Sequence, residues 1–220
     1  PGNGPDLPGE DDDAEGGLNS LIDDDTYELI KHPLTQFSCI FSALIHDVDH
    51  PGVPNHQLVR EQSQIASFYK NKSVAEQNSV EICWDLLQDD CFAELRAEIH
   101  STWEEHWHFR QLIVNAVLAT DIMDADLKRL RDGRWQRAFA DIPRTRTEEA
   151  LNINRRATIV IEHLLQASDV AHTMQHWQIY RKWNERLLVE LVAAYRTGRA
   201  DVDPFNYWYR GELDFFDNYV

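Results

Sequence analysis

Apolar residues recur at steps of three and four along the chain from about residue 33 onward. In the first such stretch, Phe37, Phe41, Leu44 and Ile45 fall on one side of a helix. The same spacing predicts helices over several further ranges: 56–70, 75–89, 91–100, 104–122, 147–173 and 175–196, with shorter helices over 124–141 and a last helix after residue 204. No stretch alternates between apolar and polar positions as a strand does, so we expect an all-α domain.

Residues 1–32 lack this pattern and are rich in acidic residues, Gly and Pro. We expect a disordered acidic linker or insert here, followed by one helical domain over residues 33–220. Ten acidic residues and no Lys or Arg lie in residues 1–30, so this segment accounts for −10 of the net charge of −17 and leaves −7 for the rest. So acidic a chain argues against nucleic acid as a partner, because the phosphate backbone would repel it.

The apolar runs are shorter than the roughly 20 residues that a membrane span needs, and the charged start does not resemble a signal peptide. Three scattered cysteines (Cys39, Cys83 and Cys91) form neither a disulfide framework nor a zinc motif. We therefore expect an intracellular, cytosolic location and no membrane contact from this segment. The chain starts without Met and stops inside its last predicted helix. We expect a fragment of a larger parent with further domains, where any membrane attachment would lie in other segments.

The stretch ALIHDVDHPGVPN, residues 43–55, places two histidines and two aspartates within the five positions from His46 to His50. A helix that simply ends here explains the Pro-Gly that follows. It does not explain a His-Asp pair next to core positions, where polar groups carry a desolvation cost. Imidazole and carboxylate groups together suit zinc, manganese, iron or magnesium. We therefore expect His46 and Asp47 to begin a metal site.

A second source of ligands is the segment LLQASDVAHTMQHW, residues 164–177. Asp169 lies among small and apolar residues late in the long predicted helix, where a lone acid needs a cation or a hydrogen-bond donor. His172 and His176 follow on roughly the same face. Two structural alternatives stay open here: Asp169 as a capped or salt-bridged acid, and His50 as a cap of backbone carbonyls.

Five segments resemble, in order and spacing, those of the class I 3′,5′-cyclic nucleotide phosphodiesterases, within the wider HD metallohydrolase group. They are HDVDHPGVPN (46–55), SVAEQNSV (73–80), VLATDIM (117–123), ASDVAHT (167–173) and GELDFFDNYV (211–220). The resemblance covers about residues 33–220. It implies a compact all-helical bundle with a deep pocket that holds two metal ions. The implied reaction is hydrolysis of the 3′ phosphoester bond of cyclic AMP or cyclic GMP in signal transduction.

The resemblance also implies roles for residues at the metal end of the pocket. His46, Asp47 and Asp169 would bind a first ion, expected to be zinc. Asp47 would bridge to a second ion, expected to be magnesium or manganese, so that Asp47 and Asp169 also border the substrate. His50, Glu76 and Thr120 would hold waters of the second ion or orient the ligands of the first.

Three departures from the family pattern affect these roles. An H-N-x-x-H-A segment, which supplies another metal histidine and the proton donor for the leaving oxygen, is not found in residues 1–45, and we expect it upstream. At the substrate end, where Phe215 would stack on the purine, Glu212 stands in place of a glutamine. A carboxylate only accepts hydrogen bonds, which favours cyclic GMP. His172, often asparagine in the family, would contact the ring or the metal waters.

Two alternatives to this enzyme stay open. One is another phosphohydrolase of the HD group, which the Phe215 segment argues against. The other is a domain that binds a nucleotide or a metal ion without turnover, which the missing upstream segment favours.

Overall fold

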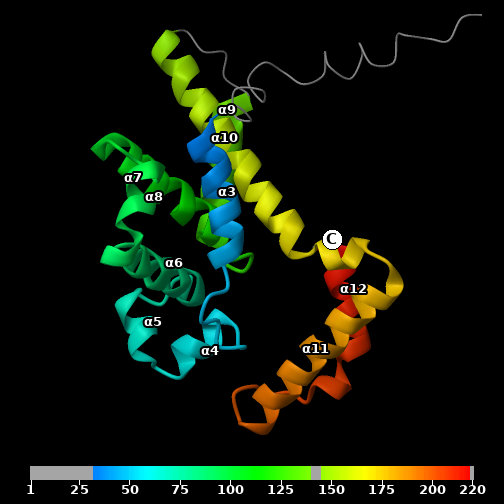
Figure 1. Ribbon diagram of the computed structural model, residues 1–220. Helices are drawn as coiled ribbons and strands as arrows, with labels where there is room; N and C mark the ends of the chain where they lie inside the picture. The colour runs from blue at the N-terminus through cyan, green and yellow to red at the C-terminus, as the bar shows by residue number, and fades with distance from the viewer. Residues whose placement is uncertain (1–31, 140–144, 219–220) are drawn as a thin grey trace, which may run out of the picture.

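A computed structural model describes residues 32–139 and 145–218 of the chain. Every regular element in these ranges is helical (Figure 1), which confirms the all-α prediction. The elements are α3 (Pro33–Ile45), α4 (Asn55–Arg60), α5 (Gln64–Phe68), α6 (Val74–Leu87), η1 (Asp90–Phe92), α7 (Ala93–Ile99), α8 (Trp103–Leu118), α9 (Ala125–Phe139), α10 (Arg146–Asp169), η2 (Ala171–Met174), α11 (Trp177–Arg196), η3 (Pro204–Asn206) and α12 (Trp208–Asn218). The acidic segment predicted over 1–32 lies outside the described residues except for His32. Within the described ranges, no helix is long and apolar enough to cross a bilayer.

The continuous helix predicted over 56–70 is wrong, because a turn divides it into α4 and α5. Gln62 takes a left-handed φ of 52° between them. The side chain of Ser63 then caps α5 by accepting a hydrogen bond of 3.1 Å from the Ala66 amide. The shorter helices predicted over 124–141 are replaced by one helix, α9, which extends to Phe139 in the described part of this stretch.

Helices α8 and α10 both end before their predicted last residues. Helix α8 ends at Leu118, and the Thr120 hydroxyl then donates to the Val117 carbonyl at 2.7 Å. The Asp121 carboxylate accepts from the Met123 amide at 3.1 Å, so side-chain bonds replace the helical pairing here. Helix α10 ends at Asp169 and the 3-10 turn η2 follows. Asp169 is therefore a helix-terminal residue, not an interior one.

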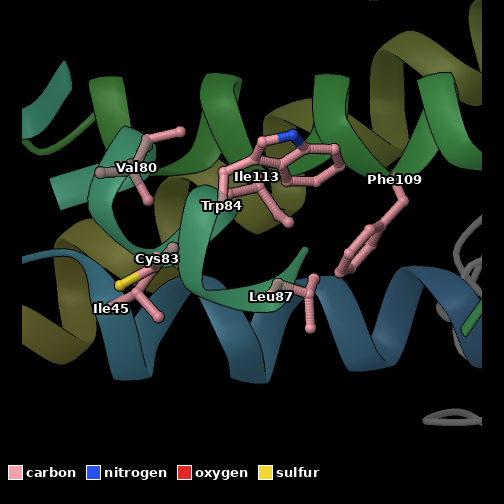
Figure 2. Close-up of a cluster of buried hydrophobic side chains, with 8 residues drawn as sticks. Ile45, Val80, Cys83, Trp84, Leu87, Phe109 and Ile113 are labelled. Atoms are coloured by element: carbon pink, nitrogen blue, oxygen red, sulfur yellow. The ribbon is translucent and has the colours of Figure 1, made fainter. Parts of the chain in front are cut away.

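The main core lies between α3, α6 and α8, as Figure 2 shows. Its buried side chains come from all three helices: Ile45, Val80, Cys83, Trp84, Leu87, Phe109, Ile113 and Val117. Phe37 and Phe41 pack against this cluster with ring centroids 5.8 and 5.9 Å from that of Phe109. Removal of this apolar surface from water is the main force that holds the three helices together.

A second buried cluster joins α8 to α10 through Leu112, Ala116, Ile161 and Leu165. Helix α10 also contacts α3 directly. Because α3 and α10 pack on the same helix and on each other, their C-terminal ends come close together. This packing positions the candidate site.

Helices α11 and α12 form a pair that lies to one side of the α3–α8 group in Figure 1. The pair follows η2 directly at one end. Near its other end, Ala194 of α11 is buried with Val53 and Leu58, and Arg199 forms an ion pair of 2.7 Å with Glu61. Contacts at both ends therefore fix the α11–α12 pair relative to the helices that carry the candidate metal ligands.

Candidate functional site

The structure brings together the three residues that the sequence assigns to a first metal ion. The Nε2 atom of His46 lies 3.3 Å from Oδ2 of Asp47 and 3.5 Å from Oδ1 of Asp169. One candidate ligand atom of each residue lies within 4.8 Å of the other two. One imidazole and two carboxylates form a donor set that suits zinc and several other divalent ions.

The second ring nitrogen of His46 fixes which nitrogen can bind an ion. Its Nδ1 lies 2.9 Å from the carbonyl oxygen of Ala43. Since a carbonyl only accepts, Nδ1 carries a hydrogen, and Nε2 of the neutral ring directs its lone pair toward the carboxylates. A backbone carbonyl behind the ring is the usual support of a metal-binding histidine.

The electrostatics of the cluster favour a positive charge at its centre. In the absence of an ion, hydrogen bonds to Asp169 and then to Asp47 raise the pKa of His46 to about 10, against the opposing effect of burial. The hydrogen bond from His46 in turn lowers the pKa of Asp47, although burial opposes this. A proton on Nε2 therefore stands where a divalent cation would bind.

Both segments reach the cluster at the C-terminal ends of helices. Helix α3 ends at Ile45, directly before His46, and Asp169 is the last residue of α10. The partial negative charge of a helix C-terminus stabilises a nearby cation. The Asp47 side chain is 64% exposed and that of Asp169 is 41% exposed. The sequence analysis expected these polar groups to lie against the core at a desolvation cost. This expectation is wrong for the two carboxylates, which lie where an ion can approach from solvent.

A cavity of about 890 Å³ adjoins the cluster. It lies between the ends of α3 and α10 on one side and the α11–α12 pair on the other. Six residues assigned from the sequence line it: His46, Asp47, Asp169, His172, Glu212 and Phe215. The candidate metal ligands and the candidate purine contacts therefore share one cavity.

Two residues that the sequence analysis missed hold Glu212 in this cavity. The Tyr180 hydroxyl and the Asn184 side-chain amide both donate to Oε2 of Glu212, the latter at 2.6 Å. The Tyr180 ring lies parallel to that of His172, with centroids 6.3 Å apart. The helical spacing of Tyr180 and Asn184 on α11 puts them on one face, but that spacing alone does not identify their partner on α12.

His50, Glu76 and Thr120 line a second cavity, of about 570 Å³, and not the first. The Nδ1 atom of His50 accepts from the Gly52 amide at 3.2 Å, so this nitrogen caps an amide and not the carbonyls considered in the sequence analysis. Burial raises the pKa of Glu76 in this second cavity, and the hydrogen bond from Asn55 opposes the rise. The candidate second-ion residues thus lie in a different cavity from His46, Asp47 and Asp169.

Asn55 is the centre of a polar network behind the second cavity. Its Nδ2 donates to Glu76 at 2.8 Å and to Asp121 at 3.2 Å, while its Oδ1 accepts from the Ala75 amide at 2.9 Å. Ser73 donates to Asp121, which is 5% exposed. The sequence analysis gave Asn55 and Asp121 no role, although Asn55 closes the segment HDVDHPGVPN and Asp121 follows Thr120.

His176 lies outside the first cavity's lining. Its Nδ1 accepts from the Gln178 amide at 3.3 Å and caps the start of α11. The 3-10 turn η2 separates it from α10, so the helical face that the sequence analysis assumed for Asp169, His172 and His176 does not exist. Asp169 and His172 still line one cavity, because η2 turns His172 toward α11.

Comparison with known proteins identifies relatives of the chain. The sequence model of the 3′5′-cyclic nucleotide phosphodiesterases matches residues 18–205, which begins inside the acidic segment and ends before Glu212. A probable 3′,5′-cyclic phosphodiesterase of Caenorhabditis elegans is 27% identical over 157 residues, covering 71% of this chain and 21% of that protein. A human dual specificity calcium/calmodulin-dependent 3′,5′-cyclic nucleotide phosphodiesterase 1B is 29% identical, covering 76% of this chain and 28% of that protein. The chain thus spans about a quarter of the length of these relatives.

Solved structures agree with the fold. The phosphodiesterase domain of a RhoPDE fusion protein from the choanoflagellate Salpingoeca rosetta superposes with a TM-score of 0.64 at 20% identity. The superposition covers 84% of this chain and 58% of that domain. A second structure of a Salpingoeca rosetta rhodopsin phosphodiesterase domain gives a TM-score of 0.66 at 19% identity, covering 84% and 56%. At this identity the likeness concerns the arrangement of helices alone.

Proposed function

This chain belongs to the 3′5′-cyclic nucleotide phosphodiesterase family, and we propose that it contributes the catalytic site of an enzyme that hydrolyses the 3′ phosphoester bond of 3′,5′-cyclic nucleotides. One observation carries the proposal. The His46, Asp47 and Asp169 cluster borders the same cavity as Glu212 and Phe215. A cation site at one end and an aromatic ring with a polar partner at the other suit a substrate with a phosphate and a purine.

Within this proposal, His46, Asp47 and Asp169 would hold a first ion, zinc, and Asp47 would also contribute to the site of a second ion, magnesium or manganese. The chemistry of the donor set supports it, because one nitrogen and two carboxylates converge and the imidazole is oriented by the Ala43 carbonyl. Two divalent ions at such a site neutralise the charge of a phosphate and lower the pKa of a water toward neutrality.

The purine end of the cavity orients the substrate. Phe215 offers a ring face for stacking, and such contacts are worth roughly 0.5–1.5 kcal/mol beyond the buried area. His172 lines the same cavity, and its ring lies parallel to that of Tyr180. Placement of the base in this way would hold the phosphoester near Asp47 and Asp169. Such positioning raises the rate because the reacting groups are already oriented when the substrate is bound.

His50, Glu76 and Thr120 act from the second cavity in this proposal. Glu76 is partly buried and accepts a hydrogen bond from Asn55, which holds its carboxylate in place. The Thr120 hydroxyl donates its hydrogen to the Val117 carbonyl, so the lone pairs of its oxygen can accept hydrogen bonds. The Glu76 carboxylate and the Thr120 hydroxyl oxygen would accept hydrogen bonds from waters that surround a divalent ion, whereas Nε2–H of His50 would donate one, because its Nδ1 accepts from the Gly52 amide. None of the described residues is assigned the protonation of the leaving 3′ oxygen.

The experiment that tests the proposal compares matched acid-to-amide variants of the intact protein. Asp169→Asn removes a charge from the cluster, whereas Asp132→Asn removes one from an exposed position on α9. We expect Asp169→Asn to lower kcat/KM for cyclic AMP and cyclic GMP by about 100-fold or more, and Asp132→Asn to leave it unchanged. Full activity of Asp169→Asn, or hydrolysis of other phosphoesters in preference to cyclic nucleotides, would refute the proposal.

A further inference from the structure

Two histidines meet at the junction between α7 and α8. His100 follows the last residue of α7, and His106 lies one turn into α8. Their rings are almost perpendicular, with centroids 4.7 Å apart, and Nε2 of His100 lies 3.3 Å from Nδ1 of His106. Both residues are half-buried, so solvent and small ions can reach them. The pair belongs neither to the His46 cluster nor to the lining of the two cavities.

The residues around the two histidines hold them in place. The Thr102 hydroxyl accepts from the Glu105 amide at 3.1 Å. In return, the Glu105 carboxylate accepts from the Ser101 and Thr102 amides at 2.8 and 3.1 Å. The His106 ring also stacks on that of Trp103, with centroids 5.3 Å apart and the planes 5° from parallel. Two ring nitrogens held in this way lose little freedom when they bind a common ligand.

The protonation of the pair leaves its nitrogens able to bind a cation. In a hydrogen bond between two neutral imidazoles, one nitrogen donates and the other accepts. Burial, followed by the charge of a protonated His106, lowers the pKa of His100, which is therefore neutral at pH 7. An ion that binds both nitrogens takes the place of the shared hydrogen, which moves to the other nitrogen of its own ring.

The distance between the two nitrogens fits one class of ion. Two nitrogens bound to the same zinc ion at tetrahedral angles lie about 3.3–3.4 Å apart, since each Zn–N bond is about 2.0–2.1 Å long. In the square-planar sites that copper(II) favours, bonds of that length place neighbouring nitrogens about 2.9 Å apart. Magnesium and calcium take oxygen ligands. The observed separation of 3.3 Å therefore matches a tetrahedral zinc ion.

Helix α7 has little apolar packing to hold it against α8. Each of its side chains is exposed or half-buried. Arg96 donates hydrogen bonds to the carbonyls of Leu87 and Asp89, which attach the middle of the helix to the residues before it. A ligand shared by His100 and His106 would attach its C-terminal end to α8. Metal ions stabilise many small elements that bury little apolar surface.

We propose that His100 and His106 together bind a zinc ion that joins α7 to α8, with water completing its coordination. The site is structural and takes no part in hydrolysis, so the inference does not rest on the proposed function. Two protein ligands hold the ion less tightly than the four of a closed zinc site, so zinc binds reversibly here. Because the ion binds only when both rings are in place, it should stabilise the C-terminal end of α7.

The test uses zinc alone as the probe and the unaltered, intact protein. Diethyl pyrocarbonate acylates neutral histidine nitrogens, and mass spectrometry of the peptides gives a rate for each histidine. With zinc at about ten times its dissociation constant, we expect the modification of His100 and His106 to slow by about tenfold. His163 is the matched control, because it is exposed and lies 5.7 Å from the Trp135 ring but has no histidine partner. Its rate should not change.

Two variants test whether the histidines act as a pair. His100→Gln should remove the protection of His106 by zinc, and His106→Gln should remove that of His100, because one imidazole alone does not retain the ion. Amide hydrogen exchange in α7 should slow on addition of zinc in the unaltered protein and in His163→Gln. In His100→Gln and His106→Gln, zinc should leave the exchange in α7 unchanged.

Mutual protection of the two histidines, with slower amide exchange in α7, would support the inference. Equal modification rates of His100 with and without zinc in the unaltered protein would overturn it, whether or not the variants fold. Protection of His100 that persists in His106→Gln would also overturn it, because the two rings would then not share an ion. Each of these results leaves the hydrolysis of cyclic nucleotides and the His46 cluster to their own tests.

Discussion

The Nε2 atom of His46, one residue beyond α3, lies 3.5 Å from Oδ1 of Asp169, the last residue of α10. The two residues are far apart in the sequence and meet because α3 and α10 pack on α8 and on each other. Ile45, directly before His46, is 4% exposed, and Leu165, one helical turn before Asp169, is 3% exposed. Two buried anchors thus bring the partly buried His46 ring and the exposed Asp169 carboxylate together, so that folding itself forms the cluster.

Metal binding should release protons. His46 has a pKa of about 10 in the ion-free protein, so its ring is protonated at pH 7 and must lose that proton when Nε2 binds an ion. We expect about one proton to be released per zinc ion at pH 7, and less as the pH rises toward 10. Calorimetric titrations in buffers of different ionisation enthalpy measure this number. Release of no protons at pH 7 would contradict the assignment of His46 as a ligand.

The same group should give the ion-free protein a pH-dependent stability. The folded pKa of His46 is raised from 6.5 to about 10. Its contribution to stability is therefore fully present below pH 6.5 and is lost as the pH rises through 10. We expect His46→Gln to lower the urea midpoint at pH 6 and to have a smaller effect at pH 10.5. An effect of His46→Gln on the urea midpoint that is equal at the two pH values would contradict the raised pKa.

Asn55→Ala should destabilise the protein. It removes the donor shared by Glu76 and Asp121 and the acceptor for the Ala75 amide. Polar groups left unpaired in a part-buried site cost roughly 1–3 kcal/mol. Urea unfolding should show a loss of this size, whereas Asn206→Ala, at an exposed position in η3, should change the free energy of unfolding little. Equal stability of the two variants would show that the network does not hold the second cavity.

Two glycines should respond in opposite ways to substitution by alanine. Gly52 has a φ of +67°, and a Cβ there would lie 3.2 Å from Cγ of Glu190 on α11. Gly133 lies within α9 with no atom within 4 Å of a Cβ. We expect Gly52→Ala to lower the free energy of unfolding by about 1 kcal/mol or more. Gly133→Ala should raise it by about 0.5–1 kcal/mol. Thermal unfolding of both variants measures the difference, and the same sign for both would contradict this account of the contact with α11.

The sequence predicted the all-helical fold and the candidate ligands His46, Asp47 and Asp169, because each of these has a local signal, whereas the meeting of the ligands depends on the packing of α3 against α10. Helical spacing marked α3 and α10, and the adjacent His46 and Asp47 marked an unusual helix end. It could not place the end of α10 at Asp169, because apolar spacing continues into η2. The division between α4 and α5 was also missed, since Gln62 takes a left-handed φ without a glycine to signal it.

The purine end was predicted less completely. Glu212 and Phe215 followed from the resemblance, but Tyr180 and Asn184 did not, because their role depends on how α11 lies against α12. Helical spacing says which residues share a face, and it does not say which helix that face meets. The sequence also did not show that the predicted residues divide between two cavities. This division depends on a tertiary contact, because the turn after α8 brings Asp121 to Asn55.

The most direct test of the central claim is the hydrolysis of cyclic nucleotides by the intact protein after its divalent ions are removed and then restored. We predict that chelation abolishes hydrolysis of cyclic AMP and cyclic GMP, and that zinc with magnesium or manganese restores it. We also predict that restoration fails in Asp169→Asn and succeeds in Asp132→Asn. Hydrolysis that persists without divalent ions, or that ions restore equally in both variants, would contradict the claim that His46, Asp47 and Asp169 form the catalytic metal site.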